Sequence, residues 1–231
     1  MKRTLVAFLL AALAVPARAQ EEKRPPPFGS FEFMAGLYRP NVDSEFTNGA
    51  HPWLTSFGTG RNWLYRAGWA RDVYSRYGSI ELGVQVGWFH QVGHGTLPDG
   101  SPSGDRTAFA MIPTSATLTY RLDVFADRYG VPLAPYGRFA LDRYNWWVTN
   151  GNGKTVKTGA TNGYSLAAGL ALLLDWFDPR LARDFWMDTG ILHTYLFGEA
   201  RWTHVDDFGS KTSWILSDDK VSISGGLLFV Y

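Results

Sequence analysis

The stretch SGGLLFVY, residues 224 to 231, ends the chain and alternates in side-chain character. Successive side chains of a strand point to opposite faces, so Leu227, Phe229 and Tyr231 share one face. The chain therefore ends inside a β-sheet, on an aromatic residue. An apolar terminal strand is an aggregation hazard at the edge of a soluble sheet, but it is normal in a closed barrel surrounded by lipid. The pattern predicts a transmembrane β-barrel.

The N-terminus has the pattern of an export signal. Lys2 and Arg3 precede the apolar run LVAFLLAALAV, and residues 17–19 give the small-x-small motif that a signal peptidase cuts. We expect residues 1–19 to be a cleaved signal peptide and residues 20–28, QEEKRPPPF, to be an extended periplasmic leader. The barrel domain is then residues 29–231, placed in the cell outer membrane after Sec-type export through the periplasm.

The composition excludes several classes of protein. The chain has no cysteine, which excludes a lipoprotein, a disulfide-stapled domain, a thiolate metal site and a cysteine nucleophile. Without Lys2, Arg3 and Arg18 of the signal, the 22 basic residues become 19 against 21 acidic ones, a net charge of −2. This balance gives no indication of a nucleic-acid partner. Aromatic residues make up 16% of the chain, with ten tryptophans, which suits two interfacial girdles.

Alternating segments predict an all-β fold, an antiparallel up-and-down transmembrane β-barrel of eight strands. We expect the strands near 31–39, 62–70, 79–89, 108–121, 134–148, 164–175 and 191–203, with a last one ending at Tyr231. In the fourth of them, Pro113 predicts a local defect in the hydrogen-bond ladder. In the fifth, alternation favours Phe139 and Leu141 outward, with Arg138 and Asp142 in the lumen.

The connections between these strands differ in character. The polar ones, near 41–60, 93–107, 149–163 and 204–219, are assigned to the cell exterior, because exterior loops of such barrels are long. The segment 149–163, rich in glycine and asparagine, is expected to be a long mobile loop. A short periplasmic helix is predicted near 178–186, with Asp178 as N-cap and Pro179 at the first helical position.

The inward faces of the predicted strands carry a set of polar side chains. They are Glu32, Arg66, Glu81, Arg138, Asp142, His193, Tyr195, Glu199 and Arg201. An eight-stranded barrel is only just wide enough for its own side chains, so these charges should pair across the lumen. We expect a plug of salt bridges and hydrogen bonds. A narrow channel for ions or small solutes is the alternative.

Catalytic and metal sites are not indicated. A hydrolase built on His193 would need a nucleophile within reach, but Thr194 points to the opposite face. His90 and His94 lie near the outer rim without a third ligand nearby in sequence, as ordinary rim residues do. We therefore expect no enzymatic activity, no cofactor and no metal. A lipid A-modifying enzyme is a more remote alternative.

Two exterior segments are candidates for a surface interaction. Trp53, Leu54 and Phe57 in the first loop are expected to be exposed, as are Asp206 and Asp207 in the last. Loops carry function on a rigid scaffold, so these residues are candidates for contact with a surface partner or with the cations of lipopolysaccharide. Solvated loop tips are the simpler interpretation.

The C-terminal residues also carry a resemblance. Ser224, Gly226, Phe229 and Tyr231 match, position by position, a signal that resembles those read by the barrel-assembly machinery. The stretches LAPYGRFALDRY, DTGILHTYLFGEARW and LSDDKVSISGGLLFVY resemble an uncharacterised family of small Gram-negative outer-membrane barrels of OmpA/OmpW-like architecture.

This resemblance covers nearly the whole mature chain and implies a location and a fold rather than an activity. It implies outer-membrane lipids and lipopolysaccharide as surroundings and the barrel-assembly machinery as a partner during biogenesis. The surface ligand is left open. The predicted role is structural or interactive.

Overall fold

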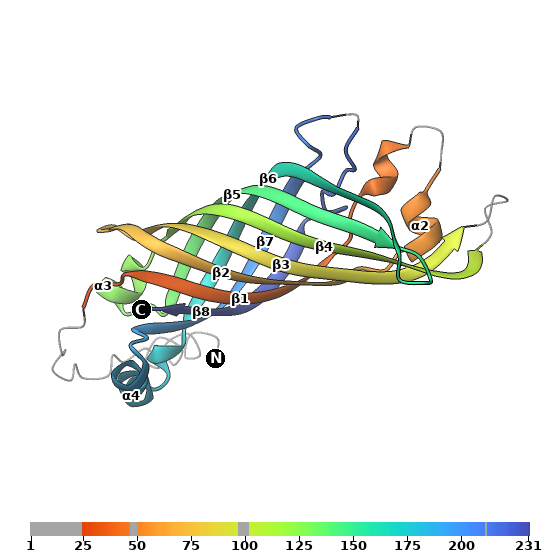
Figure 1. Ribbon diagram of the computed structural model, residues 1–231. Coiled ribbons are helices and arrows are strands. Elements are labelled where there is room, and N and C mark those ends of the chain that lie inside the picture. Colours follow the sequence, from red (N-terminus) through yellow and green to blue (C-terminus); the bar gives the residue numbers. More distant parts are fainter. Residues whose placement is uncertain (1–24, 47–49, 97–101, 211) are drawn as a thin grey trace, which may run out of the picture.

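A computed structural model of the chain describes residues 25–46, 50–96, 102–210 and 212–231, so the predicted signal peptide lies outside the described residues. Its eight strands form one closed antiparallel barrel in chain order (Figure 1). They are β1 (Gly29–Tyr38), β2 (Asn62–Ser75), β3 (Ser79–Thr96), β4 (Pro102–Arg121), β5 (Leu133–Thr149), β6 (Thr155–Leu173), β7 (His193–Val205) and β8 (Ser222–Val230). Because β8 pairs with β1, the sheet has no free edge. The predicted fold class and strand number are confirmed.

Short helical segments occupy the connections. They are the 3-10 helices η1 (Val42–Glu45) and η2 (Leu174–Trp176) and the α-helices α2 (Pro52–Phe57), α3 (Val124–Tyr129) and α4 (Pro179–Thr189). In Figure 1, α2 lies at one end of the barrel, and α3 and α4 lie at the other end with the C-terminus. No helix within the described residues is both long and apolar enough to cross a membrane.

Helix α4 begins as the sequence predicts. The Asp178 carboxylate accepts hydrogen bonds from the backbone N–H groups of Arg180 and Leu181, and Pro179 occupies the first turn. Gly190 ends the helix in the left-handed region, with a φ of 80°. The predicted helix near 178–186 is therefore confirmed and runs one turn further.

The outward face of the barrel is a belt of apolar side chains. Phe33 and Val84 are each 57% exposed, and Ile223 is 66% exposed. Soluble proteins rarely expose contiguous apolar surface of this extent, whereas lipid-facing barrel walls require it. In β5, Phe139 and Leu141 point outward, as the alternation predicts.

The strands β2, β3, β4 and β6 each extend well beyond one predicted end, whereas β5 agrees with its prediction to within one residue. The predicted mobile loop at 149–163 is wrong, because β5 and β6 pair as far as Thr149 and Thr155, leaving a turn near 150–154. Glycine has a packing role here. A Cβ atom on Gly159 would collide with the ring of Trp146, so this glycine admits the indole rather than loosening the chain. Similarly, much of the predicted loop at 93–107 belongs to β3 and β4.

Pro113 interrupts the hydrogen-bond ladder between β3 and β4, as predicted. The ladder between β3 and β4 pairs Val86 with Thr114 and then resumes at Phe89 and Met111, with no assigned pairs between them along these described strands. The register is the same on both sides of the gap. Proline has no N–H group to donate, which accounts for the gap.

Gly226 is required where the barrel closes. It faces Met34 across the seam between β1 and β8, and a Cβ atom would collide with the carbonyl oxygen of Phe33. We expect Gly226→Val to destabilise the folded barrel by about 3 kcal/mol or more, because backbone atoms cannot move aside. The measurement is the urea midpoint of the heat-modifiable band on gels.

Gly198→Ala is the matched control for this variant. A Cβ atom there would approach only the carbonyl oxygen of Ser224, at 4.0 Å, so its midpoint should stay close to that of the wild type. Equal midpoints for Gly226→Val and the wild type would contradict the steric argument.

Candidate functional site

Five polar side chains form a closed ring inside the barrel. Arg138 pairs with Glu32 through Nη2 at 2.8 Å and with Glu199 through Nη1 at 3.3 Å. Arg201 pairs with the other oxygen of Glu199 at 2.8 Å. Gln85 completes the ring, because its amide donates to Glu32 at 2.5 Å and accepts from Arg201 at 3.2 Å. Two glutamates and two arginines give the ring no net charge.

Neighbouring side chains hold this ring in place. The hydroxyl of Tyr136 donates to Glu199 at 3.1 Å, and Nε of Arg138 donates to Thr119 at 3.0 Å. Every member of the ring is at most 8% exposed. Each charge removed from water therefore faces an opposite charge, which is the arrangement that buried ions require.

A second ion cluster lies nearer the end of the barrel that carries α3 and α4, which the sequence predicts to be the periplasmic end. Arg121 pairs with Glu81 at 2.8 Å and with Asp123 at 2.6 Å. Ser30 donates to Glu81 at 3.2 Å, and the Arg121 guanidinium lies 5.5 Å from the ring centre of Tyr195. The sequence analysis does not include Arg121 among the lumen residues. Arg121 lies an even number of residues from the inward-facing Ser115 on β4, so extending the alternation to the end of the strand would place it inside.

Arg66 and Asp142 lie in the lumen but do not pair with each other. Arg66 donates to the hydroxyl of Tyr144 at 3.2 Å, and Asp142 accepts from Ser115 at 2.5 Å. Among the described residues, Nε of Arg66, Oδ2 of Asp142 and Nη1 of Arg201 have no hydrogen-bond partner. The centre of the lumen thus keeps some unused hydrogen-bonding capacity.

His193 lies outside this network. Its Nδ1 atom is 2.9 Å from Oδ2 of Asp175, at the periplasmic mouth, and its side chain is 26% exposed. The prediction that it shares the lumen network is wrong, because β7 begins at His193 and this residue lies below the packed interior. Tyr195, two residues on, is buried in the apolar layer beneath the ring.

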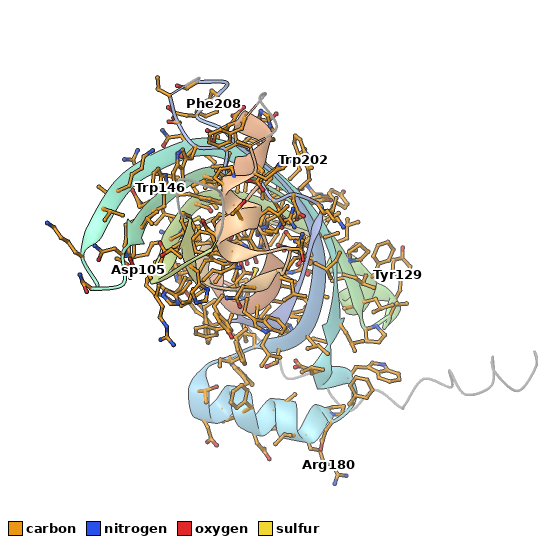
Figure 2. All side chains as sticks on the ribbon, turned by 90° about the vertical axis from the view of Figure 1, so that its right-hand side faces the viewer. Asp105, Tyr129, Trp146, Arg180, Trp202 and Phe208 are labelled. Atoms are coloured by element: carbon orange, nitrogen blue, oxygen red, sulfur yellow. The ribbon has the colours of Figure 1, made fainter. Side chains whose placement is uncertain are left out.

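Apolar side chains pack on each side of the ion ring, and on the side of α3 and α4 they share the lumen with the ion cluster of Arg121. The periplasmic layer contains Met34, Ala134, Tyr136, Ala171, Tyr195, Phe197, Leu228 and Val230. The extracellular layer contains Tyr38, Val42, Trp53, Leu64, Phe89, Phe109, Met111, Tyr144, Trp146, Val205 and Leu216. Figure 2 looks onto the end of the barrel that carries α2, predicted to be extracellular, and shows this helix lying across the opening, above an interior crowded with side chains.

The prediction that Trp53 is exposed in the first loop is wrong. Trp53 is 3% exposed and packs edge-on against Phe109, with ring centres 5.2 Å apart. Asp43 positions it by accepting hydrogen bonds from the backbone N–H groups of Trp53 at 2.7 Å and Leu54 at 3.1 Å. Leu54 is 40% exposed, and Phe57 is half-buried against the same layer.

A cluster of ion pairs joins the first and last exterior connections. Arg61 bonds to Asp218 at 2.6 Å and also to Asp219, and Arg39 lies 3.3 Å from Asp219. We call these four residues the rim latch. Burial and a hydrogen bond shared with Asp219 raise the pKa of Asp218 to about 7, against the opposing effect of Arg61.

The other exterior residues singled out in the sequence are Asp206, Asp207 and His90, and the structure shows what each of them contacts. Asp206 lies 3.2 Å from His204, and Asp207 accepts hydrogen bonds from Asn162 and Ser213. His90 points outward, with its ring parallel to that of Trp88.

Of the four residues in the C-terminal pattern, Ser224 points into the lumen and Gly226 lies at the seam. Phe229 stacks on Phe31 with ring centres 4.9 Å apart, and the Tyr231 hydroxyl accepts from the indole of Trp69 at 2.6 Å. Their role as an assembly signal stays a prediction.

Comparison with known proteins gives structural matches only. No family model matches the chain, and no curated protein matches its sequence. Its structure is similar to Neisserial surface protein A, with a TM-score of 0.51 and 12% identity over 88% of this chain and 97% of the other. Further matches are the N-terminal β-barrel domain of OprF from Pseudomonas aeruginosa (TM-score 0.42, 14% identity, 89% and 100% covered) and Ail, the attachment invasion locus protein of Yersinia pestis (0.38, 8%, 90% and 97%). The likeness to the Neisserial protein shows the fold, a closed eight-stranded antiparallel barrel.

Proposed function

We propose that this chain is an integral outer-membrane barrel with a closed lumen and a structural or surface-interaction role. The observation that carries the proposal is the filling of the interior. The cavity beside Glu32, Thr119 and Arg138 measures about 10 Å³, at the lower limit for a single water molecule. The apolar layer beneath α2 opposes the passage of a hydrated ion.

The proposed location is supported by the outer wall of the barrel. Its apolar belt would be unfavourable in water, and a closed barrel satisfies the backbone hydrogen bonds that lipid cannot. Trp63 and Trp202 point outward near the extracellular end, and Phe31 and Tyr231 near the periplasmic end. These aromatics suit the two membrane interfaces.

The surface role is supported by the contacts that hold the exterior connections in a defined conformation. Asp43 holds α2 over the opening, and the rim latch holds the last connection beside it. The Glu45 carboxylate also accepts from the backbone N–H of Ile215. A partner would therefore meet a fixed surface, which lowers the entropy lost on binding.

A narrow channel is the second candidate. The unpaired polar atoms of Arg66, Asp142 and Arg201 favour it, because a permeating ion needs polar groups to replace its water. The apolar layer beneath α2 argues against it unless that layer opens.

Conductance separates the two candidates. We expect the folded protein to be electrically silent in a planar bilayer, while its heat-modifiable migration shows that the barrel is intact. Steady openings whose ion selectivity changes in Arg138→Gln and Glu199→Gln would establish a pore lined by the ring and would refute the closed lumen.

The ion ring should contribute strongly to stability. Glu199→Gln removes the carboxylate shared by Arg138 and Arg201 while keeping the side-chain shape. The cost expected for uncompensated buried charge is about 3 kcal/mol, read as a lower urea midpoint in lipid vesicles. The control is Asp105→Asn, on the exposed β3–β4 hairpin, which should change the midpoint by under about 0.5 kcal/mol. An unchanged midpoint for Glu199→Gln would contradict the ring's role.

The rim latch should make stability depend on pH. The pKa of Asp218 is about 7 in the folded protein and about 3.9 in an unfolded chain, so the folded state holds a proton that the unfolded state releases. The stability from this group therefore falls as pH rises from about 4 to above 7. Relative to Asp218→Asn, the wild type should lose at least about 3 °C of unfolding temperature between pH 5 and pH 8.

Asp105→Asn is again the control for charge removal, and it should follow the pH profile of the wild type. Parallel profiles for the wild type and Asp218→Asn would show that Asp218 does not titrate in this window.

A further inference from the structure

A groove indents the lipid-facing wall over β2 to β5, outside the lumen. Its volume is about 640 Å³, and its lining includes Ala67, Trp69, Val86, Ala116, Leu141 and Arg143. The two alanines leave a hollow between the larger Trp69 and Leu141. The lining is almost entirely apolar, with one charged side chain, Arg143.

The depth of Arg143 follows from the register. Residues paired across neighbouring strands form a row that runs around the barrel from β3 through β4 to β8 and on to β1. One such row starts at the periplasmic end of β3 and reaches β1 near its extracellular end. Its members, in order, are Ser79, Arg121, Tyr136, Gly169, Glu199, Ser224 and Gly36. Rows therefore climb toward the exterior in this direction, by about 3 Å per strand for the strand tilt of such barrels.

Arg143 thus lies at the level of the extracellular aromatic residues. The row from Ala67 runs through Val86 and Thr114 to Arg143, three steps and about 9 Å closer to the exterior. Trp88 lies two residues beyond Val86 on β3, a rise of about 5 Å, which brings it close to the level of Arg143. The groove therefore runs from the hydrocarbon region to the headgroup level.

The Arg143 guanidinium is exposed and little used by the protein. Its Nη1 atom donates to Oδ1 of Asn162 at 3.1 Å, and it has no salt bridge within the described parts of the chain. Asn162 in turn donates to Asp207 at 2.7 Å, so the Asp207 carboxylate is linked to Arg143 through the side chain of Asn162. An arginine on the lipid face costs little near the interface, and its remaining N–H groups suit a phosphate.

We propose that this groove binds an acyl chain of an outer-leaflet membrane lipid that carries a phosphate, with Arg143 pairing the phosphate. The apolar hollow fits the chain, and the single cation at its headgroup end complements the anionic group. The inference rests on the proposed outer-membrane location and names the lipid class that the wall recognises.

The test is native mass spectrometry of the folded protein in detergent, titrated with bisphosphorylated lipid A or with the same lipid after phosphate removal. We expect the wild type to bind the phosphorylated form at least about 5-fold more tightly, in line with one charge-assisted contact of about 1 kcal/mol. Arg143→Gln should abolish this preference. Ala116→Leu, which fills the groove, should weaken binding of both forms several-fold.

Two matched variants serve as controls. Arg71→Gln removes another outward arginine, nearer the periplasmic end, and Ala200→Leu enlarges another outward alanine, on β7. Both should bind lipid as the wild type does. Equal binding of the two lipid forms by the wild type, a preference retained in Arg143→Gln, or Ala116→Leu binding like Ala200→Leu would each overturn the proposal.

The migration of each variant on gels separates the two proposals. A heat-modifiable barrel that shows no phosphate preference refutes the groove and leaves the closed barrel standing. Failure of the wild type to form such a barrel would refute both.

Discussion

The pairing of β8 with β1 is the constraint on which the rest of this structure depends. In a lipid bilayer, an unpaired strand edge leaves backbone N–H and C=O groups without partners, so the sheet has to close. Closure with eight strands fixes the interior at about the width of the side chains themselves. Gly226 is the local expression of this constraint, since the carbonyl of Phe33 approaches too closely for any Cβ atom. The inward residues must then either pack or pair.

The interior meets this requirement in layers. The ion ring is neutral and connects four strands, so it ties β1, β3, β5 and β7 together across the lumen. Every member of the ring is at most 8% exposed, and this burial strengthens each ion pair and also raises the cost of losing a partner. The strands alone do not fill the extracellular layer. Trp53 comes from a connection, and Asp43 fixes the helix that delivers it.

Alternation of side chains carried most of the fold prediction. A period of two fixes which residues face lipid, and it correctly placed Arg138 and Asp142 inside and Leu141 outside. It does not fix where a strand ends. Gly159 resembles a loop residue in sequence, but the sheet continues through it because the Trp146 ring occupies the space of a side chain. It also says nothing of residues between strands, so the inward position of Trp53 had no signal that periodicity could detect. His193 has inward parity but lies at the first residue of β7, where parity no longer implies burial.

Because the side chains of the barrel fill its interior, we expect ligands to bind on its surfaces rather than in its lumen. Most large inward side chains belong to the ring, to the Arg121 cluster or to an apolar layer, so a ligand entering there would have to displace contacts worth several kcal/mol. Side chains on the outer wall need not pack against other parts of the protein, because lipid chains adapt to the shape of the surface. Small residues at Ala67 and Ala116 therefore cost the fold little and create a hollow that bulk packing does not demand. A charged residue at the end of that hollow is tolerated only at the interface, which is where the register places Arg143.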